Sequence, residues 1–145
     1  MGKINEFISE FPLYIEVDVQ WGDMDAAQHV NNTVYLRWVE SSRIEYFKKL
    51  GHGVSPEAGE AGFILGYQDC KYIFPVSFPD IVIVGVKVTE IGEDRFFMES
   101  HVFSKKNQRL AAISKQTVVT YNYSTLKKVR VPKELKNRIL ALKRI

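Results

Sequence analysis

The sequence predicts a single α+β domain over residues 1–145, in which a curved antiparallel sheet wraps one long helix. Only one long stretch, which begins near residue 32, has the apolar spacing of an amphipathic helix. One strand-like segment precedes this helix, and four follow it with no second long helix between them. Consecutive strands favour an antiparallel meander, and the apolar face of the helix gives the sheet a surface to cover.

The first predicted strand is residues 13–20, where apolar and mostly polar residues alternate with the period of a half-buried strand. Its apolar positions are Leu13, Ile15, Val17 and Val19. The strand leads into a polar loop, residues 23–32, that holds two carboxylates, one imidazole and three carboxamides. No other stretch places so many ionisable, amide and capping residues ahead of a helix. We therefore look for function in this loop first.

The helix after the loop has clear signals at both ends. Its apolar residues recur at steps of three and four: Leu36, Val39, Tyr46 or Phe47, and Leu50. Asn31, Asn32 or Thr33 supplies the N-cap, and Gly51 ends the helix. The polar loop therefore meets the positive end of a helix of about 18 residues and 27 Å. A negative charge that develops there meets unpaired backbone N–H donors.

The rest of the chain is predicted to be mostly strand. After a loop rich in Gly and Pro at 52–62, the strand-like segments are 63–74, 81–91, 95–104 and 109–123. Alternate valines from Val82 to Val88 share one face of the second segment, and Asn107 with Gln108 forms a hairpin connection. A short amphipathic helix ends the chain, with Pro132 at its first position.

Composition argues against several classes of protein. No apolar run approaches the roughly 20 residues of a membrane span, and the N-terminus lacks a basic segment followed by an apolar one. Cys70 is the single cysteine, which excludes an internal disulfide, and no Cys/His cluster has the spacing of a zinc site. We therefore expect a soluble cytoplasmic protein with no metal site and no membrane partner.

The polar loop and the helix carry a recognisable set of residues. They are Trp21-Gly22-Asp23-Met24-Asp25, His29-Val30-Asn31-Asn32, Tyr35, Glu40 and Arg43. This set resembles the signature of hotdog-fold acyl thioesterases, above all the 4-hydroxybenzoyl-CoA thioesterase family and the acyl-ACP thioesterases. Residues 72–76 and 78–80 resemble the strand and turn of that family, so the likeness spans about residues 13–123.

The resemblance implies roles for two loop residues. Asp25 matches the catalytic carboxylate, which acts as a general base on water or as a nucleophile. His29 matches a histidine that either polarises the thioester carbonyl or fixes the loop. Asp23 is expected to hold the loop through backbone hydrogen bonds. The chain departs from the family at Ala27, where acyl-ACP members have asparagine, and at Pro79, where glycine is common.

Candidate substrate-binding residues lie on the first turns of the helix. Asn31 and Asn32 either cap the helix and hold the loop through hydrogen bonds or donate hydrogen bonds to substrate. Tyr35 and Trp38 line either the core or an acyl tunnel. Arg43 lies near the apolar stripe and needs a partner, for which Glu40 is a candidate.

The function that the resemblance implies is hydrolysis of an acyl-CoA thioester to a carboxylic acid and coenzyme A, without a cofactor. It also implies a homodimer or homotetramer with the active site between two subunits. An acyl-ACP thioesterase is an alternative that Ala27 disfavours. A hydratase is disfavoured by the short step from Asp25 to His29, and a non-catalytic acyl-thioester-binding domain by the presence of Asp25.

Positive charge is concentrated at the C-terminus. Residues 1–123 carry 12 Lys and Arg against 16 Asp and Glu, whereas residues 124–145 carry eight against one. One interpretation is a terminal helix that packs by its apolar stripe and exposes its charges to solvent. The alternative is that the tail attracts the phosphates of coenzyme A. Because the tail has no motif that reads bases, we expect no nucleic-acid partner.

Overall fold

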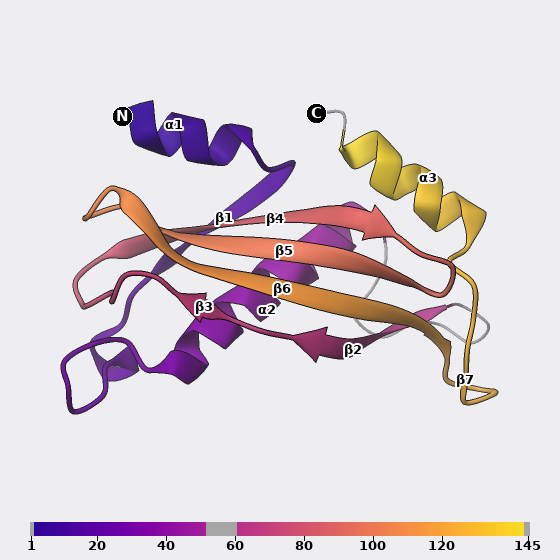
Figure 1. Cartoon of the computed structure of the whole chain (residues 1–145), viewed down its shortest axis with the longest axis horizontal. Helices are drawn as coiled ribbons and strands as arrows, with labels where there is room; N and C mark the ends of the chain where they lie inside the picture. The colour runs from indigo at the N-terminus through magenta and orange to yellow at the C-terminus, as the bar shows by residue number, and fades with distance from the viewer. Residues whose placement is uncertain (1, 52–60, 144–145) are drawn as a thin grey trace.

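The structure is a computed structural model that describes residues 2–51 and 61–143. The predicted loop at 52–62 therefore lies largely outside the described residues. The helices are α1 (Gly2–Ser9), α2 (Asn32–Lys49) and α3 (Lys133–Leu142) (Figure 1). The strands are β1 (Leu13–Asp18), β2 (Gly62–Gln68), β3 (Lys71–Tyr72), β4 (Ile81–Ile91), β5 (Arg95–Ser104), β6 (Arg109–Asn122) and β7 (Lys127–Lys128).

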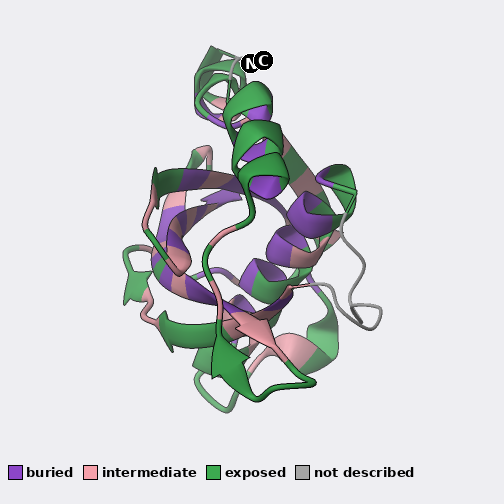
Figure 2. Ribbon diagram, turned by 90° about the vertical axis from the view of Figure 1, so that its right-hand side faces the viewer, coloured by how far each residue is buried: buried purple, intermediate pink, exposed green. Residues whose placement is uncertain are grey.

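The predicted architecture is confirmed: one antiparallel sheet curls around α2. The main strand order is β1-β4-β5-β6-β2, and both β3 and β7 also pair with β6. Figure 2 shows buried residues on the surfaces where the sheet and α2 face each other. This arrangement is the α+β fold that the resemblance to hotdog thioesterases implied.

Apolar periodicity explains the core. The alternate valines of β4 point inward and are at most 2% exposed, as their spacing predicts. One core cluster surrounds the start of α2, where Tyr35, Trp38 and Val39 meet the inner face of the sheet. A second surrounds the end of α2, where Tyr46 and Phe47 meet α3. The two clusters bury the apolar stripe of α2 along its length.

A buried polar network lies between α2 and the inner face of the sheet. Arg43 donates from Nη1 to Gln116 Oε1 (3.2 Å), and Gln116 Nε2 donates to Ser100 Oγ (3.3 Å). Burial lowers the pKa of Arg43, whereas the nearby Glu40 carboxylate raises it. The hydrogen-bond partner of Arg43 is therefore Gln116, on β6, and Glu40 contributes only electrostatic attraction.

Three sequence-based expectations are wrong in detail. No helix was expected before residue 13, but α1 forms because Phe7 and Phe11 pack against Ile83 and Phe103 on the outer face of the sheet. Such a short helix is stabilised by tertiary packing and has little periodicity of its own. The segment 63–74 is two strands, β2 and β3, with a register shift inside β2. Pro132 is the N-cap of α3 and precedes its first residue.

The N-terminal segment can pack closely because Gly85 lies beneath it. A methyl group at Gly85 would lie 2.5 Å from the ring of Phe11. We expect Gly85→Ala to lower the free energy of unfolding by about 1–3 kcal/mol through overpacking. Gly22→Ala is the matched control, since a methyl group there would meet no atom within 4 Å. Urea unfolding measures both, and an equal effect of the two substitutions would contradict this packing.

Candidate active site

Asp23 closes the base of the polar loop. The loop opens with a 3₁₀ turn over Trp21–Asp23. The Asp23 carboxylate accepts a hydrogen bond from Gln20 N (2.8 Å), and its carbonyl accepts one from Asn31 N (2.9 Å). Both groups of Asp23 therefore hold the backbone on the two sides of the loop, in agreement with the structural role expected for it.

Asp25 sits in a tight turn inside this loop. Its N–H donates to His29 O (2.9 Å), and its Oδ1 accepts from Ala27 N (2.8 Å). Gln28 closes the turn with a positive φ of 66°. Among the residues that the structure describes, no donor lies within hydrogen-bonding distance of Asp25 Oδ2. One oxygen of Asp25 thus fixes the carboxylate, and the other is free to react.

The loop is tied to the segment that follows β3. Val30 N donates to Val76 O (2.8 Å), and Ser77 Oγ donates to Gln28 O (2.9 Å). Val76 N in turn donates to the hydroxyl of Tyr35, one turn into α2 (3.1 Å). The loop, the first turn of α2 and the segment around Val76 therefore form one hydrogen-bonded unit.

Asn31 is the N-cap of α2, one of the three candidates that the sequence offers. Its Oδ1 accepts from Thr33 N and from Thr33 Oγ1, both at 3.0 Å. Because α2 begins at Asn32, its positive end lies directly beside the loop.

A cavity of about 260 Å³ lies between the loop, the start of α2 and the segment after β3. Its lining residues are Asp25, His29, Val30, Asn32, Tyr35, Tyr72, Ile73, Phe74 and Pro75. The structure thus brings together four of the six predicted site residues. The other two do not line the cavity: Asn31 caps the helix, and Trp38 is buried in the core beside the ring of Tyr35 (5.2 Å between centroids).

The far wall of the cavity is a feature that sequence reasoning missed. Tyr72 stacks edge-on against Tyr35 (5.1 Å between centroids) and donates from Oη to Asn32 O (3.2 Å). Tyr72 is 44% exposed, and partial burial is the main reason that its pKa is raised to about 12. The guanidinium of Arg109 lies 4.3 Å from the ring centroid of Phe74. In the sequence, the segment 72–75 is marked only by the turn that follows it. No spacing pattern predicts that this segment contacts a loop about 40 residues earlier.

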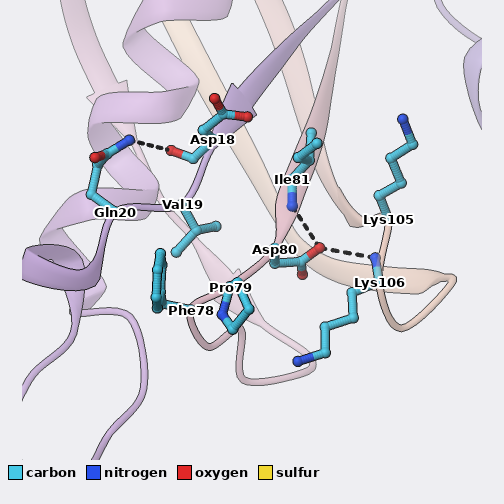
Figure 3. Close-up of a pocket in the computed structure, with 9 residues that line it drawn as sticks. All are labelled: Asp18, Val19, Gln20, Phe78, Pro79, Asp80, Ile81, Lys105 and Lys106. Atoms are coloured by element: carbon cyan, nitrogen blue, oxygen red, sulfur yellow. Dashed lines mark hydrogen bonds between the residues drawn. The ribbon is translucent and has the colours of Figure 1, made fainter.

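A larger cavity, of about 600 Å³, lies farther along the same segment, where it leads into β4 (Figure 3). It is lined by Phe78, Pro79, Lys105, Lys106 and neighbouring residues. Its central carboxylate, Asp80, accepts from Ile81 N (2.7 Å) and Lys106 N (2.9 Å) through Oδ1 and from Ser104 Oγ (2.5 Å) through Oδ2. Asp80 is therefore engaged in holding the turn. The smaller cavity, with Asp25 at its mouth, is the better candidate for an active site.

No group of three or more His, Cys, Asp or Glu side chains within 2–51 and 61–143 is placed to hold a metal ion. In the same part of the chain, no helix combines the length and apolar character needed to span a bilayer.

Comparisons with known proteins find similar sequences and similar structures. The family model for the thioesterase-like superfamily matches residues 19–139. The chain is similar to a thioesterase of Thermus thermophilus, crystallised with coenzyme A and Zn (30% identity, TM-score 0.80, covering 94% of this chain and 97% of that one). It is also similar to PA2801, a putative thioesterase of Pseudomonas aeruginosa (25% identity, TM-score 0.80, covering 89% and 98%).

A further relative is "Uncharacterized protein YsmA" of Bacillus subtilis (strain 168). It is 28% identical over 87 residues, which are 60% of this chain and 58% of that protein. The match therefore spans little more than half the length of YsmA.

Proposed function

Because the chain belongs to the thioesterase-like superfamily, we propose that it hydrolyses acyl-CoA thioesters to a carboxylic acid and free coenzyme A. The observation that carries this proposal is the placement of Asp25, with one carboxylate oxygen unengaged by the described residues, at the mouth of a cavity beside the positive end of α2. The coenzyme A bound to the Thermus thermophilus thioesterase supports coenzyme A as the acyl carrier.

Thioester hydrolysis needs an activated oxygen nucleophile and a site for the oxyanion. As a general base, Asp25 takes a proton from water while the water oxygen bonds to the thioester carbon. As a nucleophile, it attacks that carbon itself and forms an anhydride that water then opens. In both routes the C–S bond breaks and the thiolate of coenzyme A takes up a proton. The positive end of α2 stabilises the oxyanion that forms.

The cavity suggests how the substrate lies. Asp25, His29 and Asn32 are exposed at its mouth, whereas Tyr35 is 3% exposed at its floor. The thioester must reach Asp25, so the acyl group enters the cavity and coenzyme A stays outside. His29 lies where it can contact the thioester.

The first prediction compares two carboxylates of the loop. We expect Asp25→Asn to lower kcat by about 10²- to 10⁴-fold, because asparagine matches the shape of aspartate but neither takes a proton nor attacks a carbonyl. Thermal stability and affinity for substrate should change little. Asp23→Asn is the control, and it should lower stability by about 1 kcal/mol or less while kcat is nearly kept. Single-turnover rates and melting curves measure both variants, and wild-type turnover by Asp25→Asn would refute the assignment.

We propose a dimer that forms through the open edge of β2. This strand pairs with β6 along one side, and no described strand pairs with its other side. Leu65 and Tyr67 on β2 are 40% and 55% exposed. The first residue of β2 and Lys128 of β7 both pair with Tyr121. The arrow of β2 points toward the side of the molecule that holds the polar loop (Figure 1). Antiparallel pairing of two copies would therefore bring β7 of one copy toward the loop of the other.

Sedimentation velocity at micromolar concentration tests this assembly. We expect a mass of two or four chains of 16.7 kDa. Leu65→Lys should shift the protein toward monomer, because it places a charge on the paired edge. If the active site is shared, turnover falls together with the fraction of oligomer. A strict monomer with full turnover would contradict the proposal.

The basic tail is proposed to attract the phosphates of coenzyme A. Lys127 and Lys128 are exposed on β7, whereas Arg130 is paired with Glu93 (2.6 Å). In the chain itself, β7 lies at the opposite end of the sheet from the polar loop, so the dimer described above would supply the tail from the second copy (Figure 1).

Replacing Lys127 and Lys128 by Ser should raise KM for acyl-CoA several-fold without affecting a short N-acetylcysteamine thioester, which lacks the nucleotide. Added salt should reduce the difference in KM for acyl-CoA between the variant and the wild-type protein, because the screening length falls from about 10 Å at 0.1 M to 3 Å at 1 M. Lys133→Ser with Lys136→Ser on α3 is the control for net charge. Equal effects on both substrates would exclude a role for β7 in binding phosphates.

A further inference from the structure

Tyr35 is a buried hydrogen-bond donor at the floor of the cavity. Its hydroxyl oxygen accepts a hydrogen bond from Val76 N (3.1 Å), which occupies an acceptor position and leaves the O–H proton to donate. Among residues 2–51 and 61–143, no acceptor for this proton lies within hydrogen-bonding distance. Burial raises the pKa of Tyr35, so the hydroxyl keeps its proton at neutral pH.

Other polar groups around Tyr35 are already engaged. The hydroxyl of Tyr72 donates to the carbonyl of Asn32 (3.2 Å), and burial raises the pKa of the Cys70 thiol, which keeps it neutral. Asp25 and His29 lie at the exposed mouth, where the thioester must sit. The acyl group is thus the part of the substrate that reaches Tyr35.

An unused donor in a buried site discriminates between ligands. A purely apolar acyl group would cover the Tyr35 hydroxyl and leave its proton without an acceptor, which is costly in a dry environment. An acyl group with an oxygen in the right place would satisfy it. Sites that offer a hydrogen bond to a substrate reject analogues without the matching group far more strongly than apolar pockets reject a change in size.

We propose that Tyr35 is a specificity-determining residue that donates a hydrogen bond to an oxygen on the acyl group. The preferred substrates are then acyl-CoA thioesters that carry a keto or hydroxyl oxygen away from the thioester. This inference rests on the proposed thioesterase function and adds the chemical class of the acyl group to it.

The test compares acyl groups of equal length with and without the oxygen. Hexanoyl-CoA is measured beside its 3-oxo, 4-oxo and 5-oxo analogues. We expect the wild-type protein to favour at least one oxo ester over hexanoyl-CoA by about tenfold in kcat/KM, the value of one hydrogen bond. In Tyr35→Phe this preference should disappear. The substitution keeps the ring that contacts Trp38 and Tyr72.

A purely structural role for Tyr35 gives a different result. If its hydroxyl only anchors Val76, Tyr35→Phe lowers kcat/KM for all four esters by the same factor, and the inference is wrong. Tyr72→Phe is the matched control: its hydroxyl is engaged by Asn32, so the preference for the oxo ester should persist. Equal use of all four esters by the wild-type protein would also overturn the inference, whether or not a variant folds.

Failure of the proposed function is separable from failure of this inference. If no acyl-CoA is hydrolysed, the thioesterase proposal falls. Binding of hydrolysis-inert thioether analogues of the same four esters, measured by calorimetry, then still tests Tyr35. An oxo preference of about tenfold in Kd that Tyr35→Phe removes supports the inference, and equal affinities refute it.

Discussion

The site depends on the two backbone hydrogen bonds of Val76. Its carbonyl accepts from Val30 N at the end of the polar loop, and its N–H donates to the hydroxyl of Tyr35 on α2. Val76 is fully buried, so both bonds are shielded from water. They join the polar loop, the first turn of α2 and the segment around Val76. Together with the hydrogen bonds of Asp23, they fix the turn that carries Asp25 relative to the positive end of α2.

The cavity that results has two chemically distinct ends. Asp25 and His29 lie at the exposed mouth, where water is available for hydrolysis. Tyr35 lies at the buried floor, where a hydrogen bond is worth more and a missing partner costs more. Tyr35 therefore supports the segment around Val76 through its hydroxyl oxygen, and its hydroxyl proton is the donor that we propose for the acyl group. If the proposed roles hold, Tyr35 couples the position of the Asp25 carboxylate to the choice of acyl group.

Features that depend on neighbours in sequence were predictable. The α2 helix, its cap at Asn31 and the inward valines of β4 follow from local periodicity and capping chemistry. The family resemblance pointed to Asp25 and His29, which do lie together at the cavity. Long-range contacts were not predictable: Tyr72 meets Asn32 across 40 residues, and Arg43 meets Gln116 across 73. The α1 helix was missed for the same reason, because its stability comes from the sheet beneath it.

The most direct test of the central claim is a crystal structure with a hydrolysis-inert acyl-CoA thioether. The account predicts that the acyl group fills the cavity lined by Tyr35 and Tyr72, with the carbon that replaces the thioester carbonyl beside Asp25. An acyl group found instead in the larger cavity beside Phe78 and Lys106, remote from Asp25, would contradict it.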